Sequence, residues 1–332
     1  MGSNQKILVI QTAFIGDAIL ATGILEKLYK SHPTAQIDYL VRKGNDGLFK
    51  AHPFLNKLLI WNKEDGKYKD LLRLLKAIRA ERYDYVINVQ RFANSGVLTA
   101  FSKAKVKIGY DKNPFSWAFD IKAAHQVNNG LHEVERNQQL LTTISPGEAE
   151  RPKLYPSDED FLKVEAYKTS PYVCLAPASV WFTKQMPKEK WIELLDNIPH
   201  STQAFLLGAP SDKDLCEEII KTSKHSSTTN LCGALNLLQS AALMKDAEMN
   251  YVNDSAPMHL ASSMNAPTTA IFCSTIPEFG FGPLSDDSTI LQVKEKLACR
   301  PCGLHGKKAC PEGHFDCGFK IDIPLTKEGQ EA

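Results

Sequence analysis

The stretch Lys6-Ile-Leu-Val-Ile-Gln-Thr-Ala-Phe-Ile-Gly-Asp17 joins a short apolar run to the start of a helical pattern. The run from Lys6 to Ile10 is continuously apolar after its first residue, which predicts a strand that is buried on both faces. The apolar positions that follow recur at helical spacing, at Ile19, Leu20, Ile24, Leu25 and Leu28. A strand, a turn and a helix in this order form the first half of a βαβ unit, so a parallel sheet is predicted.

The same alternation of strand and helix patterns continues through both halves of the chain. Further strands are predicted at 37–41, 58–61, 84–89, 172–176, 203–207, 250–252 and 268–272. Between them, residues 145–157 (SPGEAERPKLYPS) contain three prolines and several charges, which is typical of a linker. We therefore predict an α/β fold with two Rossmann-like domains, residues 1–156 and 157–332, each with a parallel sheet.

The bulk properties of the 332 residues exclude some classes of function. The formal net charge is +1, so the chain has no general basic field of the kind that attracts nucleic acid. No apolar run approaches the roughly 20 residues that span a bilayer, and the first residues lack the layout of a signal peptide. We expect a cytoplasmic protein, with peripheral contact at a membrane surface left open.

Asp17 is the first candidate for chemistry, because it follows the first strand directly and stands at the start of a helix. The helix dipole favours its ionised form by about 0.3 to 1 kcal/mol. An ionised carboxylate at this position suits a general base, although a helix-capping aspartate is the more common use of such a residue. Only Gly16 stands where a dinucleotide fingerprint needs several glycines, which argues against a nicotinamide-dependent dehydrogenase.

Two segments of the second half are candidates for binding an anion. Thr183 and Lys184 follow the strand at 172–176, and the lysine either neutralises a diphosphate or is an ordinary surface residue. Asp254 and Ser255 end another strand, before a helix whose first turn contains proline. The amides of such a helix start bind anions, and His259 lies one turn further along. The alternative is a capped helix with a buried histidine.

Four of the eight cysteines are crowded near the end of the chain, at Cys299, Cys302, Cys310 and Cys317. Their type and number fit a structural zinc site, although the spacing differs from paired CxxC knuckles. Reduced structural cysteines, or one disulfide pair, are equally compatible with the pattern. A reducing cytosol argues against disulfides in the native protein.

Several of these segments together resemble the bacterial heptosyltransferases of glycosyltransferase family 9, particularly the heptosyltransferase II type. The matching segments are KILVIQTAFIGDAILATGILEKL, HEVERNQQLL, the Thr183-Lys184 loop, LLGAPSDKD, NLCGALNLLQSAALMKDAE, NDSAPMHLASSMNAPTTAIF and the cysteine-rich LACRPCGLHGKKACPEGHFDC. Together these segments run nearly from one end of the chain to the other. The Gly16-Asp17 element and NDSAPMHLA are the specific ones among them.

The resemblance implies a GT-B architecture of two facing Rossmann-like domains, the first for the acceptor and the second for the nucleotide sugar. It implies metal-independent, inverting transfer of heptose from ADP-heptose to a lipid-linked core saccharide of lipopolysaccharide. Transient contact with the inner membrane surface is then expected. Another nucleotide sugar or acceptor, or a non-catalytic module that binds a nucleotide sugar, is the alternative.

The resemblance also implies roles for single residues. Asp17 falls on the catalytic base, and Lys184, with Thr183 beside it, falls on the diphosphate-binding lysine. The donor-phosphate loop corresponds to Asp254, Ser255 and His259, and the nucleotide edge to Gly208 and Asp212. This chain has Ala256-Pro257 where the family usually carries glycine. Glycine lets the backbone approach a phosphate closely and proline has no amide hydrogen, so two possible amide donors to the phosphate are weakened or lost.

Overall fold

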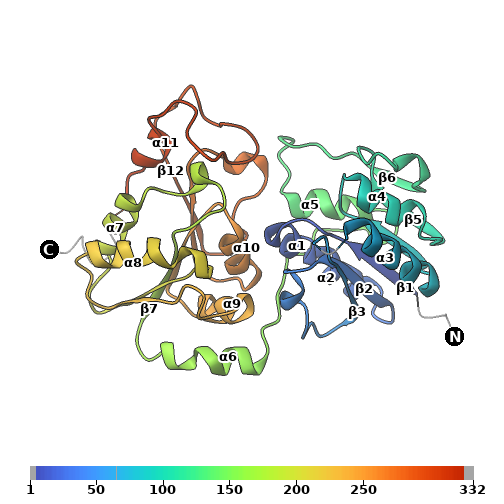
Figure 1. The fold of residues 1–332 in the computed structure, drawn as a ribbon, viewed down its shortest axis with the longest axis horizontal. Helices are drawn as coiled ribbons and strands as arrows, with labels where there is room; N and C mark the ends of the chain where they lie inside the picture. Colours follow the sequence, from blue (N-terminus) through green and yellow to red (C-terminus); the bar gives the residue numbers. More distant parts are fainter. Residues whose placement is uncertain (1–4, 65, 325–332) are drawn as a thin grey trace. The chain divides into compact units, whose positions relative to one another are not determined.

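The computed structural model describes residues 5–64 and 66–324, and the chain divides into two compact units, Met1–Tyr155 and Pro156–Ala332. We call them the N-terminal and the C-terminal unit. The division lies one residue before the predicted boundary. Each unit contains one six-stranded sheet in which every paired strand is parallel (Figure 1). The predicted α/β class with two parallel sheets is therefore confirmed.

The sheet of the N-terminal unit has the strand order β3-β2-β1-β4-β5-β6. Its elements are β1 (Lys6–Ile10), α1 (Ile15–Leu20), α2 (Thr22–Ser31), β2 (Gln36–Arg42), β3 (Leu55–Trp61), α3 (Lys67–Glu81), β4 (Tyr85–Asn88), α4 (Ala93–Ala100), β5 (Val106–Tyr110), β6 (Ile121–Ala123) and α5 (Glu133–Gln138). Helix α2 packs with α5, and α3 packs with α4. Right-handed crossovers place these two pairs on opposite faces of the sheet, because the strand order reverses direction at β1.

The sheet of the C-terminal unit has the strand order β12-β11-β10-β7-β8-β9. Its elements are α6 (Asp158–Val164), β7 (Tyr172–Ala176), α7 (Lys188–Asp196), β8 (Gln203–Leu206), α8 (Lys213–Thr222), β9 (Thr228–Asn230), α9 (Leu237–Lys245), β10 (Met249–Asn253), α10 (Ala256–Ser263), β11 (Thr268–Phe272), β12 (Ser288–Gln292) and α11 (Asp316–Phe319). Helix α7 packs with α8, while α9 packs with α10 and α6. The same crossover rule again places the two groups on opposite faces.

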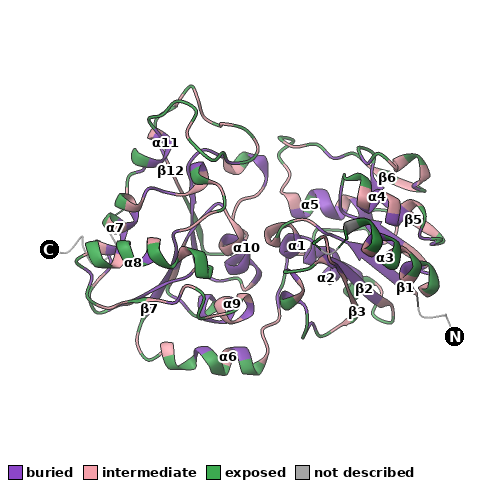
Figure 2. Ribbon diagram, viewed as in Figure 1, coloured by how far each residue is buried: buried purple, intermediate pink, exposed green. Residues whose placement is uncertain are grey.

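Each unit has a core of its own, and burial is concentrated on the central strands (Figure 2). One cluster in the N-terminal unit joins Leu8, Leu40 and Trp61 to α3. A cluster in the C-terminal unit joins Leu175 and Trp191 to residues of β8, α8 and β11 and to the cysteine-rich end of the chain. The strands read as continuous apolar runs because helices cover both faces of the sheets.

The segment 145–157, predicted as a linker, is packed along its first ten residues against the N-terminal unit. Gln138 and the backbone of Glu150 form two reciprocal hydrogen bonds, 2.6 and 2.7 Å long. The ammonium of Lys27 donates to two carbonyls of the same segment. Gly23 makes the approach possible, since a Cβ there would lie 2.6 Å from the Glu150 carbonyl oxygen. The prolines therefore mark an extended strap, bound to α2 and α5.

Across the described ranges 5–64 and 66–324, every helix is too short or too polar to cross a lipid bilayer.

Candidate functional site

Asp17, Lys184 and Asp254, among the predicted site residues, follow strands at which a sheet reverses its strand order. In the N-terminal unit the reversal lies between β1 and β4, and Asp17 follows β1. In the C-terminal unit it lies between β7 and β10, which are followed by Lys184 and Asp254. The crevice outside the carboxyl ends of two such strands is the usual ligand site of an open parallel sheet. Asp17 in one unit, and Lys184 and Asp254 in the other, therefore follow strands at the place where such a sheet usually binds its ligand.

Asp17 lies in the first turn of α1 and is half-buried. The residue that caps this helix is Phe14, and its side chain is largely exposed. Burial, together with the nearby carboxylate of Glu133, raises the pKa of Asp17 to about 6. Hydrogen bonds from the amides of Phe14 and of Asp17 itself act in the opposite direction, as does the charge of Arg91. A carboxyl group with a pKa near 6 can exchange a proton near neutral pH.

Glu133 is held beside Asp17 by two basic side chains that are themselves fully buried. The Nε of Arg136 lies 2.8 Å from one carboxylate oxygen, and the Nε2 of His125 lies 3.4 Å from the other. Burial opposes ionisation of Glu133, but the His125 hydrogen bond and the Arg136 charge outweigh it and hold its pKa below the usual range. A charged Glu133 therefore stands close to Asp17 at neutral pH.

The turn between β1 and α1 is fixed by a polar network that sequence patterns do not reveal. The hydroxyl of Thr12 donates to Gln90 over 2.7 Å, and the amide of Gln90 donates to Gln11 over 2.7 Å. The ammonium of Lys63 donates to the Thr12 carbonyl, also over 2.7 Å. Gln90 comes directly after β4, so the network joins the two strands at the reversal point. The network therefore fixes the orientation of α1 and, with it, the position of Asp17.

In the C-terminal unit, Lys184 and Asp254 form an ion pair with an Nζ–Oδ2 distance of 2.8 Å. The hydroxyl of Thr275, which follows β11, donates to the same carboxylate oxygen over 2.6 Å. Asn253, the last residue of β10, connects this strand to the segment after β7. Its side-chain amide donates to the Pro177 carbonyl, and its side-chain oxygen accepts from the Met186 amide. The lysine is thus brought to the reversal point by contacts from β7, β10 and β11.

Thr183 is buried and bonded on several sides, in contrast to its lysine neighbour. Its hydroxyl oxygen accepts from the Ser274 hydroxyl and from the Lys307 amide, over 3.0 and 2.8 Å. Its own amide donates to the Lys307 carbonyl over 3.1 Å. Gly306 lies so close that a Cβ would be 2.7 Å from the Cγ of Lys184. The cysteine-rich end of the chain therefore clamps the Thr183-Lys184 loop.

Helix α10 begins after Ser255, which is its capping residue in extended conformation. The second residue of the helix, Pro257, has no amide hydrogen, and the amide of Met258 donates to the Ser255 carbonyl over 3.1 Å. His259 is buried in the same first turns. The Ala256-Pro257 pair thus reduces the number of amides that this helix start can offer to an anion, as the sequence indicated.

Gly208 and Asp212 lie together beyond the end of β8. The Asp212 carboxylate accepts from the Ala209 amide over 2.8 Å and so closes the turn that leads into α8. A Cβ at Gly208 would lie 3.0 Å from this carboxylate and 2.9 Å from the Sγ of Cys232. Close packing of the turn therefore requires glycine at this position.

The four clustered cysteines are thiols, as are the other four in the chain. In the described part of the chain, no three side chains of Cys, His, Asp or Glu are arranged to hold a metal ion. Cys317 and Cys310 instead pack against the core of the C-terminal unit. Arg300 anchors the segment by donating to the carbonyls of Cys273 and Thr275 over 2.6 and 2.7 Å. The zinc site stays a prediction that this arrangement does not support.

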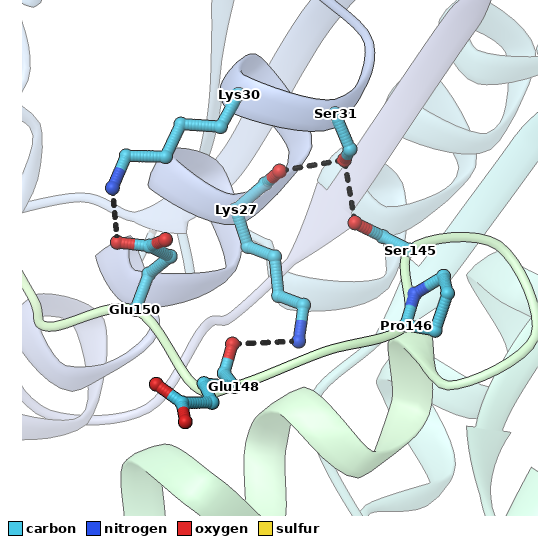
Figure 3. A pocket seen from close by; sticks show the side chains of 7 residues that line it. All are labelled: Lys27, Lys30, Ser31, Ser145, Pro146, Glu148 and Glu150. Atoms are coloured by element: carbon cyan, nitrogen blue, oxygen red, sulfur yellow. Dashed lines mark hydrogen bonds and ion pairs between the residues drawn. The ribbon is translucent and has the colours of Figure 1, made fainter.

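A hollow of about 270 Å³ in the N-terminal unit is lined by none of the predicted site residues (Figure 3). Lys27 and Lys30 are its basic residues, and both are already paired. Lys27 donates to the carbonyls of Gly147 and Glu148, and Lys30 forms an ion pair with Glu150. This hollow is therefore where the strap meets α2, and its charges are satisfied by the strap itself.

Comparison with known proteins identifies a sequence family that matches most of the chain. A sequence model of glycosyltransferase family 9 (heptosyltransferase) matches residues 71–312. Lipopolysaccharide heptosyltransferase 3 of Escherichia coli K12 is 28% identical over 287 residues, which cover 78% of this chain and 80% of that protein.

Two solved structures from E. coli have a similar fold. ADP-heptose lipopolysaccharide heptosyltransferase II superposes with a TM-score of 0.76 at 21% identity, covering 90% of this chain and 96% of that chain. Heptosyltransferase WaaC with ADP superposes with a TM-score of 0.71 at 20% identity, covering 86% and 92%. The GT-B fold predicted from the resemblance is thus the fold of these proteins.

Proposed function

Because this chain belongs to glycosyltransferase family 9, the heptosyltransferases, we propose that it transfers heptose from ADP-heptose to the core saccharide of lipopolysaccharide. The names of its relatives support this choice of donor and acceptor. The observation that carries the proposal is the half-buried Asp17 at the reversal point of the N-terminal sheet, with a pKa of about 6.

Asp17 is the catalytic base in this proposal. An acceptor hydroxyl attacks the anomeric carbon of the donor sugar, the bond to the diphosphate breaks on the opposite side, and the carbon is inverted. The hydroxyl loses its proton to the Asp17 carboxylate, a contribution typically worth about 10²- to 10⁴-fold in rate. A pKa near 6 serves this role, because the group is ionised at neutral pH and still binds a proton well.

Lys184 is assigned to the departing ADP, since negative charge builds up on the diphosphate as the bond breaks. Its partner Asp254 holds the ammonium in place when no donor is bound. Ser255, His259 and the start of α10 complete the phosphate site, and Gly208 with Asp212 forms the edge for the nucleotide. Thr183 acts on the donor through Lys184, because its hydroxyl oxygen accepts two hydrogen bonds that hold the Thr183-Lys184 loop in place.

We infer that the transfer needs no metal ion, because a lysine and helix amides supply positive charge where the diphosphate leaves. A structural zinc in the cysteine-rich end would be a separate matter. Metal analysis of the purified protein, with Cys299→Ser as the comparison, tests it directly. About one equivalent of zinc that is lost in the variant would support that site, and a metal-free native protein would remove it.

The N-terminal unit is proposed to bind the acceptor, which is a lipid-linked saccharide. Asp17 lies in this unit, and the base must contact the hydroxyl that attacks. A lipid-linked acceptor would bring the protein to the inner membrane surface for the duration of the reaction.

Titration calorimetry with ADP-heptose, ADP, UDP-glucose and GDP-mannose tests the choice of donor. We expect ADP-heptose and ADP to bind, and the other two to bind at least tenfold more weakly. Preferential binding of another nucleotide sugar would keep the glycosyltransferase and refute the heptose donor. The missing amide hydrogen at Pro257 is an observation in favour of another nucleotide sugar as the donor. A nucleotide sugar that binds but is not consumed with any acceptor would favour a non-catalytic module, and absence of binding by all four would refute the proposed donor.

A further inference from the structure

Two cysteines outside the clustered group form a close pair in the C-terminal unit. The Sγ of Cys216, in the first turns of α8, lies 3.2 Å from the Sγ of Cys232, which follows β9. A disulfide bond is about 2.05 Å long, so the two sulfur atoms are about 1 Å from bonding distance. A small movement of the two side chains and of the loop after β9 is enough to bring the sulfur atoms together.

The two thiols differ in exposure and in pKa, as the attacking and the resolving thiol of a redox pair do. Cys232 is half-buried and reachable from solvent, whereas Cys216 is fully buried beneath it. The hydrogen bond between them lowers the pKa of Cys232 and, together with burial, raises the pKa of Cys216. The nearby Asp212 carboxylate opposes ionisation of both thiols. A thiolate therefore forms first on the outer sulfur, where a reagent can meet it.

We propose that Cys216 and Cys232 form a modification site that a low-molecular-weight disulfide converts to an intramolecular disulfide. The thiolate of Cys232 attacks one sulfur of the reagent and releases the other half as a thiolate, leaving a mixed disulfide. Cys216 then attacks the Sγ of Cys232 and passes its proton to the departing half of the reagent. The second half of the reagent departs as a thiol, so one disulfide is reduced to two thiols while the protein dithiol is oxidised.

The position of the pair links this modification to the nucleotide edge, a step that rests on the proposed function. The Sγ of Cys232 packs against Gly208, where a Cβ would lie only 2.9 Å away. The amide of Gly233, the next residue, donates to the Gly208 carbonyl over 3.0 Å. Drawing Cys232 toward α8 therefore displaces the backbone that bonds to Gly208, which itself packs against Asp212. We expect the oxidised protein to bind ADP-heptose several-fold more weakly.

The experiment treats the full-length protein with oxidised glutathione and follows two readouts. Mass spectrometry of the intact protein and of an unreduced digest locates the bond, and calorimetry measures ADP-heptose binding before and after oxidation and after re-reduction. Cys232→Ser removes the attacking thiol. Cys216→Ala removes only the resolving thiol and is expected to accumulate the glutathione adduct on Cys232.

The proposal predicts loss of two hydrogens, a linked pair of peptides containing Cys216 and Cys232, and a reversible several-fold loss of affinity that Cys232→Ser abolishes. It is overturned if the linked peptides do not form, or if only cysteines at the end of the chain are joined. An unchanged affinity in the oxidised protein refutes the link to the nucleotide edge. If the reduced protein binds no nucleotide sugar while the linked peptides form, the proposed function fails and the dithiol site stands.

Discussion

The carboxyl group of Asp17 is expected to set the acid side of the pH profile. With a pKa near 6, the base is ionised above that pH, so kcat/KM should rise with pH and level off above about 7. Glu133 raises this pKa and Arg91 lowers it. Glu133→Gln should therefore move the midpoint to lower pH, and Arg91→Ala should move it to higher pH, each by up to about one unit.

The measurement is kcat/KM from pH 5 to 9 for the native protein and both variants. Opposite shifts would tie the midpoint to Asp17, because one substitution removes a negative charge and the other a positive one. A midpoint that moves in neither variant would mean that a different group titrates.

Gly306 is expected to be a positioning residue for Lys184. A Cβ at this position would lie 2.4 Å from the Cβ of Trp181 and 2.7 Å from the Cγ of Lys184, so Gly306→Ala must push the loop away. ADP binding should weaken about tenfold, which corresponds to about 1.4 kcal/mol. Gly282→Ala is the matched control, because a Cβ there meets nothing within 4 Å. Equal affinities in the two variants would show that the clamp is unimportant for the donor.

The acidic and basic residues of the candidate site could be proposed from the sequence because each lies in a segment that begins at the end of a predicted strand. Asp17, Lys184 and Asp254 are of this kind. Their partners could not be predicted in the same way. Glu133 reaches Asp17 from a helix more than a hundred residues further along the chain, and only the fold brings them together. Thr183 stays a predicted donor contact, and nothing in its neighbourhood of the sequence shows that its hydroxyl oxygen also accepts from the backbone of Lys307.

At the scale of elements, a buried histidine joins the strap to the loop before β3. The ring of His52 packs edge-on against Phe54 and Tyr155, at centroid distances of 4.4 and 4.8 Å. Neither ring nitrogen has a hydrogen-bond partner among the described residues. Burial lowers the pKa of His52 to about 4. The contact therefore depends on a neutral ring.

Acidification should weaken this contact. The unfolded chain binds the proton with a pKa near 6.5 and the folded one near 4, so stability falls as the pH falls between these values. At pH 5 the loss is about 2 kcal/mol relative to pH 7.5. His52→Leu should lose that much less between the two pH values, as measured by urea unfolding. Parallel losses in the two proteins would show that His52 is accessible to protons in the folded state.

The strap shows why element boundaries were harder to predict than the elements themselves. Three prolines and several charges are typical of a free linker, and the pattern contains no sign of the pairing between Gln138 and the Glu150 backbone. The helix predicted over 19–28 is similarly divided at Ala21 into α1 and α2. The short strands β6 and β9 have only three residues each, which is too few to produce a recognisable pattern.

At the scale of the whole molecule, the fold could be predicted because each sheet is built from apolar runs that alternate with helices. Two complete sheets with separate cores suggest that each unit folds without the other. A fragment of residues 156–332 should be folded by circular dichroism and should bind ADP within a few-fold of the full chain. In the same fragment, Lys184→Ala should weaken binding about tenfold. A fragment that folds but does not bind ADP would place part of the nucleotide site elsewhere.

The central claim is that Asp17 serves as the base in transfer from ADP-heptose, and one comparison tests it most directly. ADP release is measured with ADP-heptose and a lipopolysaccharide core acceptor for the native protein and for Asp17→Asn, alongside calorimetry of donor binding. The prediction is a loss of kcat of about 10² to 10⁴ with donor affinity nearly unchanged, since the amide keeps the shape but cannot accept the proton. Turnover in Asp17→Asn close to the native rate would contradict it.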